Sequence, residues 1–507
     1  MTPPPPGTVA SAVRSRAAEV AYEIAARLAD PERTAEKFPD LAPLSLDHGY
    51  PALALLHSEL AYEQPELRGA AHAHLGAAAA RLSGRTAQGL YHGVPALALA
   101  AHAARRTPHD YAALLTRLDA ALDRLVDRAL EPERARLDAG RPGVSFLRFD
   151  LISGVSGLAR LLLLRREAHE DALADALGYL VRLARPLALD GTSVPGWWSP
   201  GGPRTPGGAD PQYPRGHVNF GLAHGISGPL AVLSAALRDG VPVPGLREAV
   251  AGLTAALLAH RTEAGGWPAV IPLERYGTEP PEPDRTAWCY GTPGTAAALH
   301  QAGRALGDAG LCTLAADALA DDLDRPRGVA DHAFCHGHAG LLHLCHTLTE
   351  DAPHPRLAAH RDALAARLVA AYDPELPYGF PEVAAAESRD LPYGSRGAVA
   401  EEGADDPDLP YGPRATAAPE EPDAPGLPYG ARGAVAEERA DDPGLPYGSR
   451  DAATPDGLAA PRPVAAPPAA PAGPGLLTGA AGIALALHAY ATDAPPRTPW
   501  DAAFLLR

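Results

Sequence analysis

Apolar residues follow two helical patterns along this chain. Amphipathic segments, in which apolar residues recur at helical spacing, alternate with shorter segments that are apolar on nearly every side. Examples of the amphipathic segments are 11–28, 111–130, 246–260 and 357–371. Helices that are apolar all round belong inside a fold, and amphipathic helices belong on its outside. The pattern therefore predicts an all-α protein with two layers of helices.

The apolar segments open with a repeated motif: a glycine, two further residues, a small residue or proline, and then an apolar run. The glycines allow sharp turns and close approach of helix starts. The dipeptides that open the seven copies are His48-Gly49, His92-Gly93, Ser153-Gly154, His224-Gly225, Tyr290-Gly291, His336-Gly337 and Thr478-Gly479. Each repeat reads as an outer amphipathic helix, a loop and an inner apolar helix. Seven such pairs can close into a seven-fold α/α toroid, a double ring of inner and outer helices, which needs no capping repeats; a linear helical solenoid is the alternative.

One long segment, 381–473, breaks the repeat. Proline, glycine, alanine and acidic residues dominate it, and the tetrapeptide Leu-Pro-Tyr-Gly recurs through and just before it, beginning at residues 376, 391, 409, 427 and 445. Such a composition lacks the apolar periodicity of a core. We interpret the segment as a low-complexity, disordered or polyproline-like insertion. It divides the toroid into 1–380, with the first six repeats, and 474–507, with the last.

The net charge is −17, from 44 basic and 61 acidic residues, and it disfavours nucleic acid or an anionic membrane surface as a partner. The predicted insertion holds 17 acidic residues against 7 arginines, so ten of these seventeen units belong to it. The predicted toroid is therefore only mildly acidic.

No signal peptide or transmembrane segment is evident, because the longest apolar run, 151–164, is short and contains Arg160.

Four cysteines in 507 residues are too few for a disulfide scaffold and favour a reducing compartment. Cys289 and Cys335 each stand two residues before the glycine of a motif, and His336 follows Cys335. In a toroid the two cysteines face each other at the same height on neighbouring repeats. Two thiolates and one imidazole can bind Zn²⁺ and leave its fourth position open for a reactant. The alternative is that Cys289 and Cys335 are small buried hydrophobic residues and that His336 is a loop histidine with satisfied hydrogen bonds. For Cys312 and Cys345 we expect core packing.

Other polar residues stand at similar positions. His224 precedes the glycine of the fourth motif and is a candidate general acid or base. Asp150 either takes part in function or caps a helix N-terminus. Arg285, four residues before Cys289, either stabilises developing negative charge or pairs with an acid. We assign His48, His92 and His338 to loop structure, because no second ligand set assembles around them.

Together these motifs resemble the lanthionine synthetase C-like family, the lanthipeptide cyclases. The resemblance rests on Trp-Cys-Tyr-Gly at 288–291, Cys-His-Gly at 335–337, Ala-His-Gly-Ile-Ser-Gly at 223–228 and the seven glycine motifs, and it covers the chain apart from 381–473. It implies a zinc-centred seven-fold α/α toroid. The implied reaction adds a precursor-peptide cysteine to dehydroalanine or dehydrobutyrine, which gives a lanthionine or methyllanthionine thioether ring.

The resemblance also implies roles for individual residues. Cys289, Cys335 and His336 would hold one zinc per chain. His224 would protonate the enolate or take the thiol proton with support from Asp150, and the sequence leaves open which of these two moves the proton. The same resemblance has Arg285 and Tyr290 line the site.

The partners that we expect are a dehydrated precursor peptide, a dehydratase on a separate chain and an exporter, since only about 40 residues precede the first repeat. We expect a cytoplasmic protein, peripheral to a membrane-associated biosynthetic complex. Two other functions remain open: a non-catalytic thiol-binding or glutathione-binding scaffold, and a zinc protein prenyltransferase. The second is disfavoured because prenyltransferases include a carboxylate in the zinc set and need a basic diphosphate pocket.

Overall fold

The computed structural model describes residues 6–82, 89–203, 205–206, 210–278, 280–283, 285–329, 331–381 and 473–507. All of these belong to one compact unit, formed by 1–412 and 469–507. Apart from its two end residues, the predicted insertion at 381–473 lies outside the described residues, as do four of the five Leu-Pro-Tyr-Gly copies. The division of the chain at 381 and 473 therefore stays a prediction.

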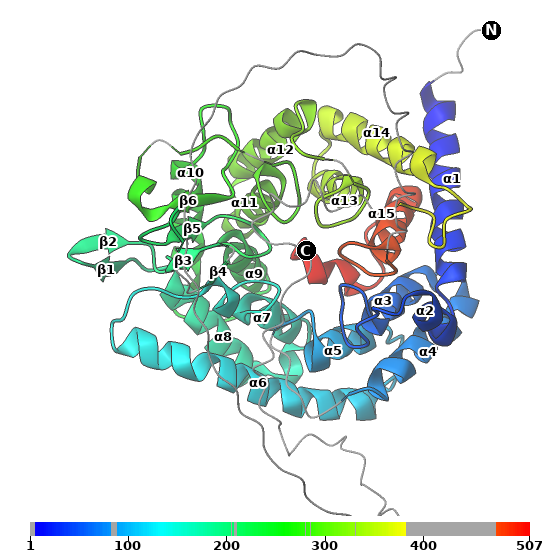
Figure 1. Ribbon diagram of the computed structural model, residues 1–507, viewed down its shortest axis with the longest axis horizontal. Coiled ribbons are helices and arrows are strands. Elements are labelled where there is room, and N and C mark those ends of the chain that lie inside the picture. Colours follow the sequence, from blue (N-terminus) through cyan, green and yellow to red (C-terminus); the bar gives the residue numbers. More distant parts are fainter. Residues whose placement is uncertain are drawn as a thin grey trace, which may run out of the picture. The chain divides into compact units, whose positions relative to one another are not determined.

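Seven buried helices form a closed inner ring within the described residues (Figure 1). They are α3 (Tyr50–Leu60), α5 (Gly93–Ala103), α7 (Val155–Leu164), α9 (Ser227–Arg238), α11 (Thr292–Leu306), α13 (His338–Leu348) and α15 (Ala480–Thr492). Each contacts the next, and α15 contacts both α13 and α3. These helices follow the seven glycine motifs of the sequence, so the predicted seven-fold toroid is confirmed.

Amphipathic helices cover the inner ring from outside. They are α1 (Pro6–Arg27), α4 (Arg68–Ala79), α6 (Ala112–Asp138), α8 (Glu170–Leu183), α10 (Leu246–Ala259), α12 (Ala309–Asp324) and α14 (Pro355–Ala371). Each inner helix except α15 packs on the outer helix that follows it, whereas α15 packs on α1. The repeat read from the sequence pairs each outer helix with the inner helix that follows it. In the packed structure the pair is instead an inner helix and the outer helix that follows it, so that pairing is wrong. Short turns explain the difference: only 307 and 308 separate α11 from α12, and so short a connection makes consecutive helices antiparallel neighbours.

The connections from each outer helix to the next inner helix are longer and carry the remaining elements. A short helix, α2 (Pro31–Lys37), lies in the first of these connections. The strands pair as three antiparallel two-stranded sheets: β1 (Leu187–Leu189) with β2 (Thr192–Val194), β3 (Gly201–Gly202) with β4 (Thr205–Pro206), and β5 (His217–Asn219) with β6 (Val270–Pro272). The long connections therefore build a separate layer at one end of the ring.

Backbone hydrogen bonds join all seven of these connections, just before the inner helices begin. Each amide donates to a carbonyl of the next repeat, over N–O distances of 2.7–3.5 Å. In order, the bonds run from Leu46 to Tyr91, Tyr91 to Ile152, Leu151 to Ala223, Ala223 to Cys289, Cys289 to Cys335, Cys335 to Leu477, and Leu476 to Leu46 and Asp47. The last bond returns to the first repeat, so the described residues form a closed hydrogen-bonded belt. We call these residues the belt.

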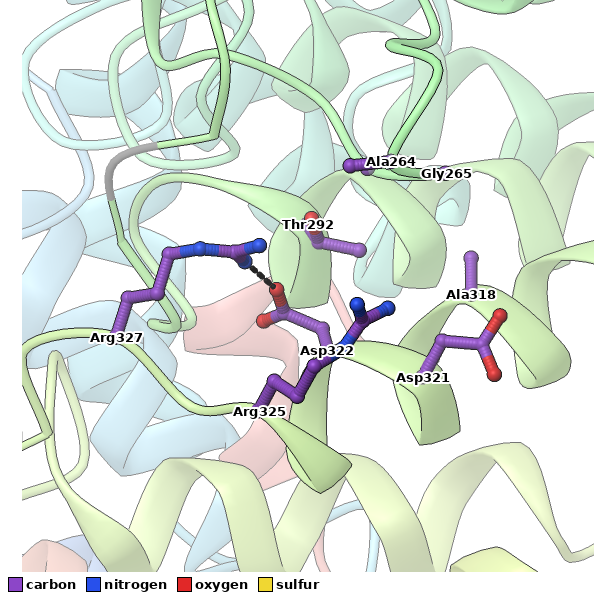
Figure 2. Close-up of a pocket in the computed structure, with 9 residues that line it drawn as sticks. Ala264, Gly265, Thr292, Ala318, Asp321, Asp322, Arg325 and Arg327 are labelled. Atoms are coloured by element: carbon purple, nitrogen blue, oxygen red, sulfur yellow. Dashed lines mark hydrogen bonds and ion pairs between the residues drawn. The ribbon is translucent and has the colours of Figure 1, made fainter.

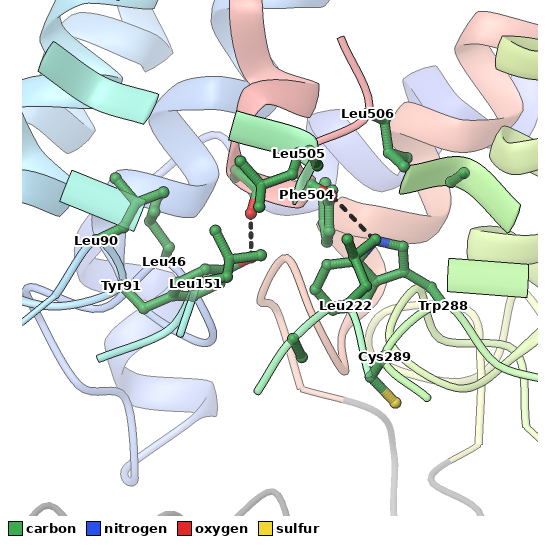
Figure 3. Close-up of a cluster of buried hydrophobic side chains, with 14 of the residues drawn as sticks. Leu46, Leu90, Tyr91, Leu151, Leu222, Trp288, Cys289, Phe504, Leu505 and Leu506 are labelled. Atoms are coloured by element: carbon green, nitrogen blue, oxygen red, sulfur yellow. Dashed lines mark hydrogen bonds between the residues drawn. The ribbon is translucent and has the colours of Figure 1, made fainter. Parts of the chain in front are cut away.

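The C-terminal segment fills the centre of the ring. A 3₁₀ helix at Pro499–Phe504 leads into Leu505 and Leu506, and these apolar residues are buried among Leu46, Tyr91, Leu151 and Trp288 (Figure 3). The Tyr91 hydroxyl donates a hydrogen bond to the Ala503 carbonyl. Among the described residues, the inner ring is therefore a packed core without an open pore at this level.

The first Leu-Pro-Tyr-Gly copy, 376–379, is part of the folded unit. Tyr378 is buried, and Gly379 has a φ of +85°, a conformation that favours glycine. Arg27 of α1 donates to the carbonyl oxygen of Leu376 at 2.8 Å.

Within the described residues, no helix combines the length and the apolarity needed to cross a bilayer.

Candidate metal centre

Cys289, Cys335 and His336 come together at the long-connection end of the ring. Their ligand atoms all lie within 4.8 Å of one another, and no other such cluster of three occurs in the described part of the chain. Cys289 lies just before α11, and the other two lie just before α13. The belt brings them together, because the Cys289 amide donates to the Cys335 carbonyl at 3.2 Å. Two thiols and one imidazole at this spacing match the donor set of a zinc site that has one open position.

Aromatic residues support the two cysteines from the centre of the ring. Trp288 precedes Cys289, and Phe334 precedes Cys335. Phe504, from the C-terminal segment, stacks on Phe334 with ring centroids 3.6 Å apart and meets Trp288 edge-on at 5.1 Å. The Trp288 indole also donates to the Phe504 carbonyl at 3.1 Å (Figure 3). The chain end therefore fixes the two segments that carry the cysteines.

Two glycines beside these segments allow close packing of the backbone. Gly291 has a φ of +84°, and a side chain there would collide with the carbonyl oxygen of Arg285. At Gly337, a Cβ atom would collide with a carboxylate oxygen of Asp331. Glycine at these positions is therefore needed to form the cluster.

The two thiols are hydrogen-bonded to each other. A hydrogen bond from Cys335 lowers the pKa of Cys289 to about 6 against the effect of burial, and the charges of His336 and Arg285 act in the same direction. The same hydrogen bond, together with burial, raises the pKa of Cys335. Of the two thiols, Cys289 is therefore the one whose charged form is favoured, and a metal ion held by both would require both to lose their protons.

Asp331 orients the imidazole of the cluster. Its carboxylate accepts a hydrogen bond from Nε2 of His336 at 2.7 Å, and its other oxygen accepts from the Ala333 amide at 2.9 Å. Burial is the largest single influence on the pKa of His336 and lowers it, but the hydrogen bond to Asp331 and the charges of Asp331 and Cys289 together outweigh burial, and the pKa is raised. With Nε2 engaged, Nδ1 is the ring nitrogen left for a metal ion, an arrangement common at zinc sites.

His224 and Asp150 form a hydrogen-bonded pair beside the cluster. Nδ1 of His224 donates to Oδ2 of Asp150 at 2.5 Å, and the other Asp150 oxygen accepts from the amides of Ser153 and Gly154 at 2.8 and 2.7 Å. Asp150 is fully buried, whereas the His224 side chain is 15% exposed. The Asp150 carboxylate thus orients His224 and holds the turn that precedes α7, whose N-cap residue, Gly154, has no side-chain cap.

The other two predicted site residues lie on the segment that carries Cys289. Arg285 is half-buried, and its charge acts on both Cys289 and His336. Tyr290 is buried, with its ring centroid 6.3 Å from that of His224, and its hydroxyl accepts a hydrogen bond from Asn219 at 3.3 Å. The described structure therefore brings all seven predicted site residues to one end of the ring.

Sequence analysis missed Asp331 and Asn219. Asp331 is an acid in the same loop as His336, five positions before it, and that spacing was the available signal. Asn219 ends strand β5 and accepts from the Gly221 amide, so only the tertiary fold places its side chain against Tyr290.

Of the cysteines assigned to packing, Cys345 is fully buried in α13, and Cys312 is partly exposed on α12.

A shallow pocket beside the start of α11 has different chemistry. It lies between the start of α11 and the end of α12, and within it Asp322 and Arg327 form an ion pair at 2.7 Å (Figure 2). The Arg327 amide donates to the Thr286 hydroxyl, and the Thr286 amide donates to the Arg327 carbonyl, each at 3.0 Å. These contacts fix the segment that leads to Cys289. The pocket therefore supports the candidate centre and contributes no thiol or imidazole of its own.

Comparisons with known proteins agree with this geometry. The nisin biosynthesis protein NisC of Lactococcus lactis subsp. lactis is 25% identical over 205 residues, which are 39% of this chain and 48% of that protein. The chain thus matches about half the length of this curated relative. The solved structure of nisin cyclase matches with a TM-score of 0.58 at 22% identity, covering 67% of this chain and 86% of that one, and supports the fold. The profile of the lanthionine synthetase C-like protein family matches residues 40–394, and the chain belongs to this family.

Proposed function

We propose that this protein is a zinc-dependent lanthipeptide cyclase. It would add the cysteine thiols of a dehydrated precursor peptide to dehydroalanine or dehydrobutyrine and so form lanthionine and methyllanthionine rings. The observation that carries the proposal is the Cys289–Cys335–His336 cluster beside the Asp150–His224 pair. Membership of the lanthionine synthetase C-like family and the likeness to nisin cyclase support it.

The cluster can hold one zinc ion through Cys289, Cys335 and His336. A zinc ion there would bind the substrate sulfur in its fourth position and favour the thiolate, the reactive form of the thiol, near neutral pH. Asp331 holds His336 in the required tautomer, and the belt fixes the separation of the two cysteines. The positive charge of Arg285 beside the cluster favours the negative charge that develops on the substrate.

His224 is the residue that takes the thiol proton in this proposal. The hydrogen bond from Nδ1 to Asp150 makes Nε2 the basic nitrogen of the neutral ring and stabilises the imidazolium that forms. Asp150 itself is fully buried, and its two oxygens are engaged by His224 and by two backbone amides. Asp150 therefore acts as a positioning residue, and His224 moves the proton.

Substrate and partners follow from the reaction. The substrate is a precursor peptide in which serine or threonine has already lost water, so a dehydratase acts first, and we expect it on a separate chain, with an exporter acting later. A thiol-binding or glutathione-binding scaffold would need no Asp150–His224 pair. A protein prenyltransferase is disfavoured because the described cluster consists of two cysteines and a histidine and lacks a carboxylate.

Mass spectrometry of an alkylated substrate tests the proposal. Ring closure leaves the peptide mass unchanged and consumes a thiol, so a thiol-alkylating probe marks only the unclosed peptide. Purified protein, supplied with a dehydrated peptide, should remove the alkylation signal faster than a reaction without protein. A folded, zinc-loaded protein that binds the peptide thiol but closes no ring would contradict the cyclase proposal and favour the scaffold.

A further inference from the structure

A second Asp–His pair lies in the first repeat, among the histidines that sequence analysis assigned to loop structure. Oδ2 of Asp47 accepts a hydrogen bond from Nδ1 of His48 at 3.1 Å, and Oδ1 accepts from the Thr478 hydroxyl at 3.2 Å. The Asp47 side chain is 13% exposed and the His48 side chain 33%. A mostly buried carboxylate thus orients a more accessible imidazole.

The pair has the same construction as Asp150–His224. In both, the histidine immediately precedes the glycine that opens an inner helix, and in both a carboxylate accepts from Nδ1. Nδ1 is engaged in each case, and in His48 the nitrogen that can exchange a proton is then Nε2. Round the ring, His224 stands one repeat before Cys289, on one side of the cluster. His48 stands two repeats beyond Cys335 and His336, on the other side.

The belt connects this pair to the metal cluster. The Leu476 amide donates to the Asp47 carbonyl at 2.7 Å, and the Cys335 amide donates to the neighbouring Leu477 carbonyl at 2.8 Å. The charge of Asp47 also acts on the thiol of Cys335 and contributes to its raised pKa. Asp47 and the cluster therefore share one end of the ring and one electrostatic environment.

The charges around His48 favour its protonated form. The hydrogen bond to Asp47 raises the pKa of His48 despite the opposing effect of burial, and the charge of Asp40 adds to the rise. Phe38 meets the ring edge-on with centroids 6.3 Å apart. Burial is the main cause that lowers the pKa of the adjacent His92, so the neutral form of that ring is favoured. His48 is therefore suited to donate a proton near neutral pH.

We propose that His48, oriented by Asp47, protonates the α-carbon of the substrate from the side of the site opposite His224. This proposal rests on the proposed cyclase function and adds to it the group that supplies the second proton. The thiol gives its proton to His224, the sulfur electron pair forms the new bond to the β-carbon, and the π pair of the double bond moves towards the carbonyl. His48 then gives its Nε2 proton to the α-carbon. One proton is taken and one is given, and solvent restores both histidines.

The α-carbon becomes a stereocentre when it is protonated, and this provides the test. We would compare wild-type protein with H48Q, using H72Q on the exposed face of α4 as the matched control. The ring-closure rate would come from thiol alkylation, and the configuration of the hydrolysed lanthionine from chiral gas chromatography. We expect H48Q to lower kcat by about 100-fold, the low end of general acid catalysis, with KM and zinc content nearly unchanged. Its remaining product should have a mixed α-carbon configuration, whereas H72Q should match wild type.

A second variant, D47N, keeps the proposal testable if H48Q does not fold. It preserves the size of the side chain and one acceptor oxygen but removes the charge and the second acceptor, so a smaller loss of kcat and partial mixing of configuration are expected. The proposal is overturned if the variants close rings at the wild-type rate, or if they lose rate with the configuration unaltered. Failure of the wild type itself to close rings would instead refute the cyclase function, and this proposal would fall with it.

Discussion

The two ends of the toroid differ in how the chain crosses them. At one end, short turns join each inner helix to the next outer helix, as at 307–308 between α11 and α12. At the other, long connections such as 184–226 lead back into the inner ring and carry the belt, the metal cluster and both Asp–His pairs. A rigid closed ring can hold reactive groups on loops, since the scaffold fixes where each loop begins and ends.

At the end of the toroid where short turns join the helices, which we call the turn end, polar contacts have a different role. The opposite end, with the long connections, is the loop end. Arg165, in the turn after α7, forms two hydrogen bonds to Asp119 of α6 at 2.8 and 2.5 Å. His169, in the same turn, contacts Asp119 at 3.1 Å and Asp123 at 2.6 Å. These groups pair with one another within the described fold, whereas the groups at the loop end include the thiols and imidazole of the candidate metal centre. The comparison predicts that changes at the loop end abolish chemistry and that changes at the turn end alter stability alone.

Replacing Cys335 with alanine should have the largest effect. The loss of one of three ligands should abolish zinc binding and reduce ring closure to the rate of the uncatalysed reaction. Metal analysis and thiol alkylation measure the two effects. The matched control is C312A, on the outer helix α12, which should keep zinc and activity. Zinc-loaded, active C335A would refute this ligand set.

Replacing His224 with glutamine should leave zinc in place and lower the ring-closure rate. The expected loss is on the order of 10²–10⁴-fold, because a positioned acid–base group contributes that much. D150N should also lower the rate, since His224 would lose the charge that stabilises its imidazolium. Unchanged single-turnover rates in both variants would show that this pair takes no part in the reaction.

Replacing Phe504 with alanine should mainly affect stability. The side chain is fully buried against Trp288 and Phe334, so its truncation should cost about 3–5 kcal/mol in the free energy of unfolding. Urea denaturation measures the loss. The control L258A truncates a partly exposed side chain on α10 and should change stability by about 0.5 kcal/mol or less. Equal effects of the two variants would show that the chain end does not support the ring.

The smallest expected effect concerns His169 at the turn end. Burial lowers its pKa, but the hydrogen bonds to Asp119 and Asp123 outweigh burial and leave it raised. A raised pKa in the folded state stabilises the protein fully below the unfolded value of about 6.5, and the stabilisation is lost as pH rises through the folded value. The stability difference between wild type and H169Q should therefore be about 1 kcal/mol or less at pH 6 and smaller at pH 8. H109Q, at an exposed position in the preceding turn, should show no such pH dependence, and a difference that grows with pH would contradict the assignment.

The sequence predicted the inner ring because each of its helices begins at a glycine motif, and it predicted the clustering of Cys289 and Cys335 because they occupy the same place in neighbouring repeats. It could not show which outer helix packs on which inner helix, since an alternating pattern reads the same in either grouping. Nor could it place Phe504, a single aromatic residue near the chain end, between Trp288 and Phe334. Those contacts join segments far apart in the chain, and periodicity carries no information about them.

X-ray absorption at the zinc edge tests the central claim most directly. The purified protein should hold one zinc ion bound by two sulfurs and one imidazole nitrogen, with one lighter atom completing the set. Adding the dehydrated peptide should raise the number of bound sulfurs from two to three, because the substrate thiol takes the open position. A folded, active protein without zinc, or a sulfur count that does not change when the peptide is added, would contradict the account.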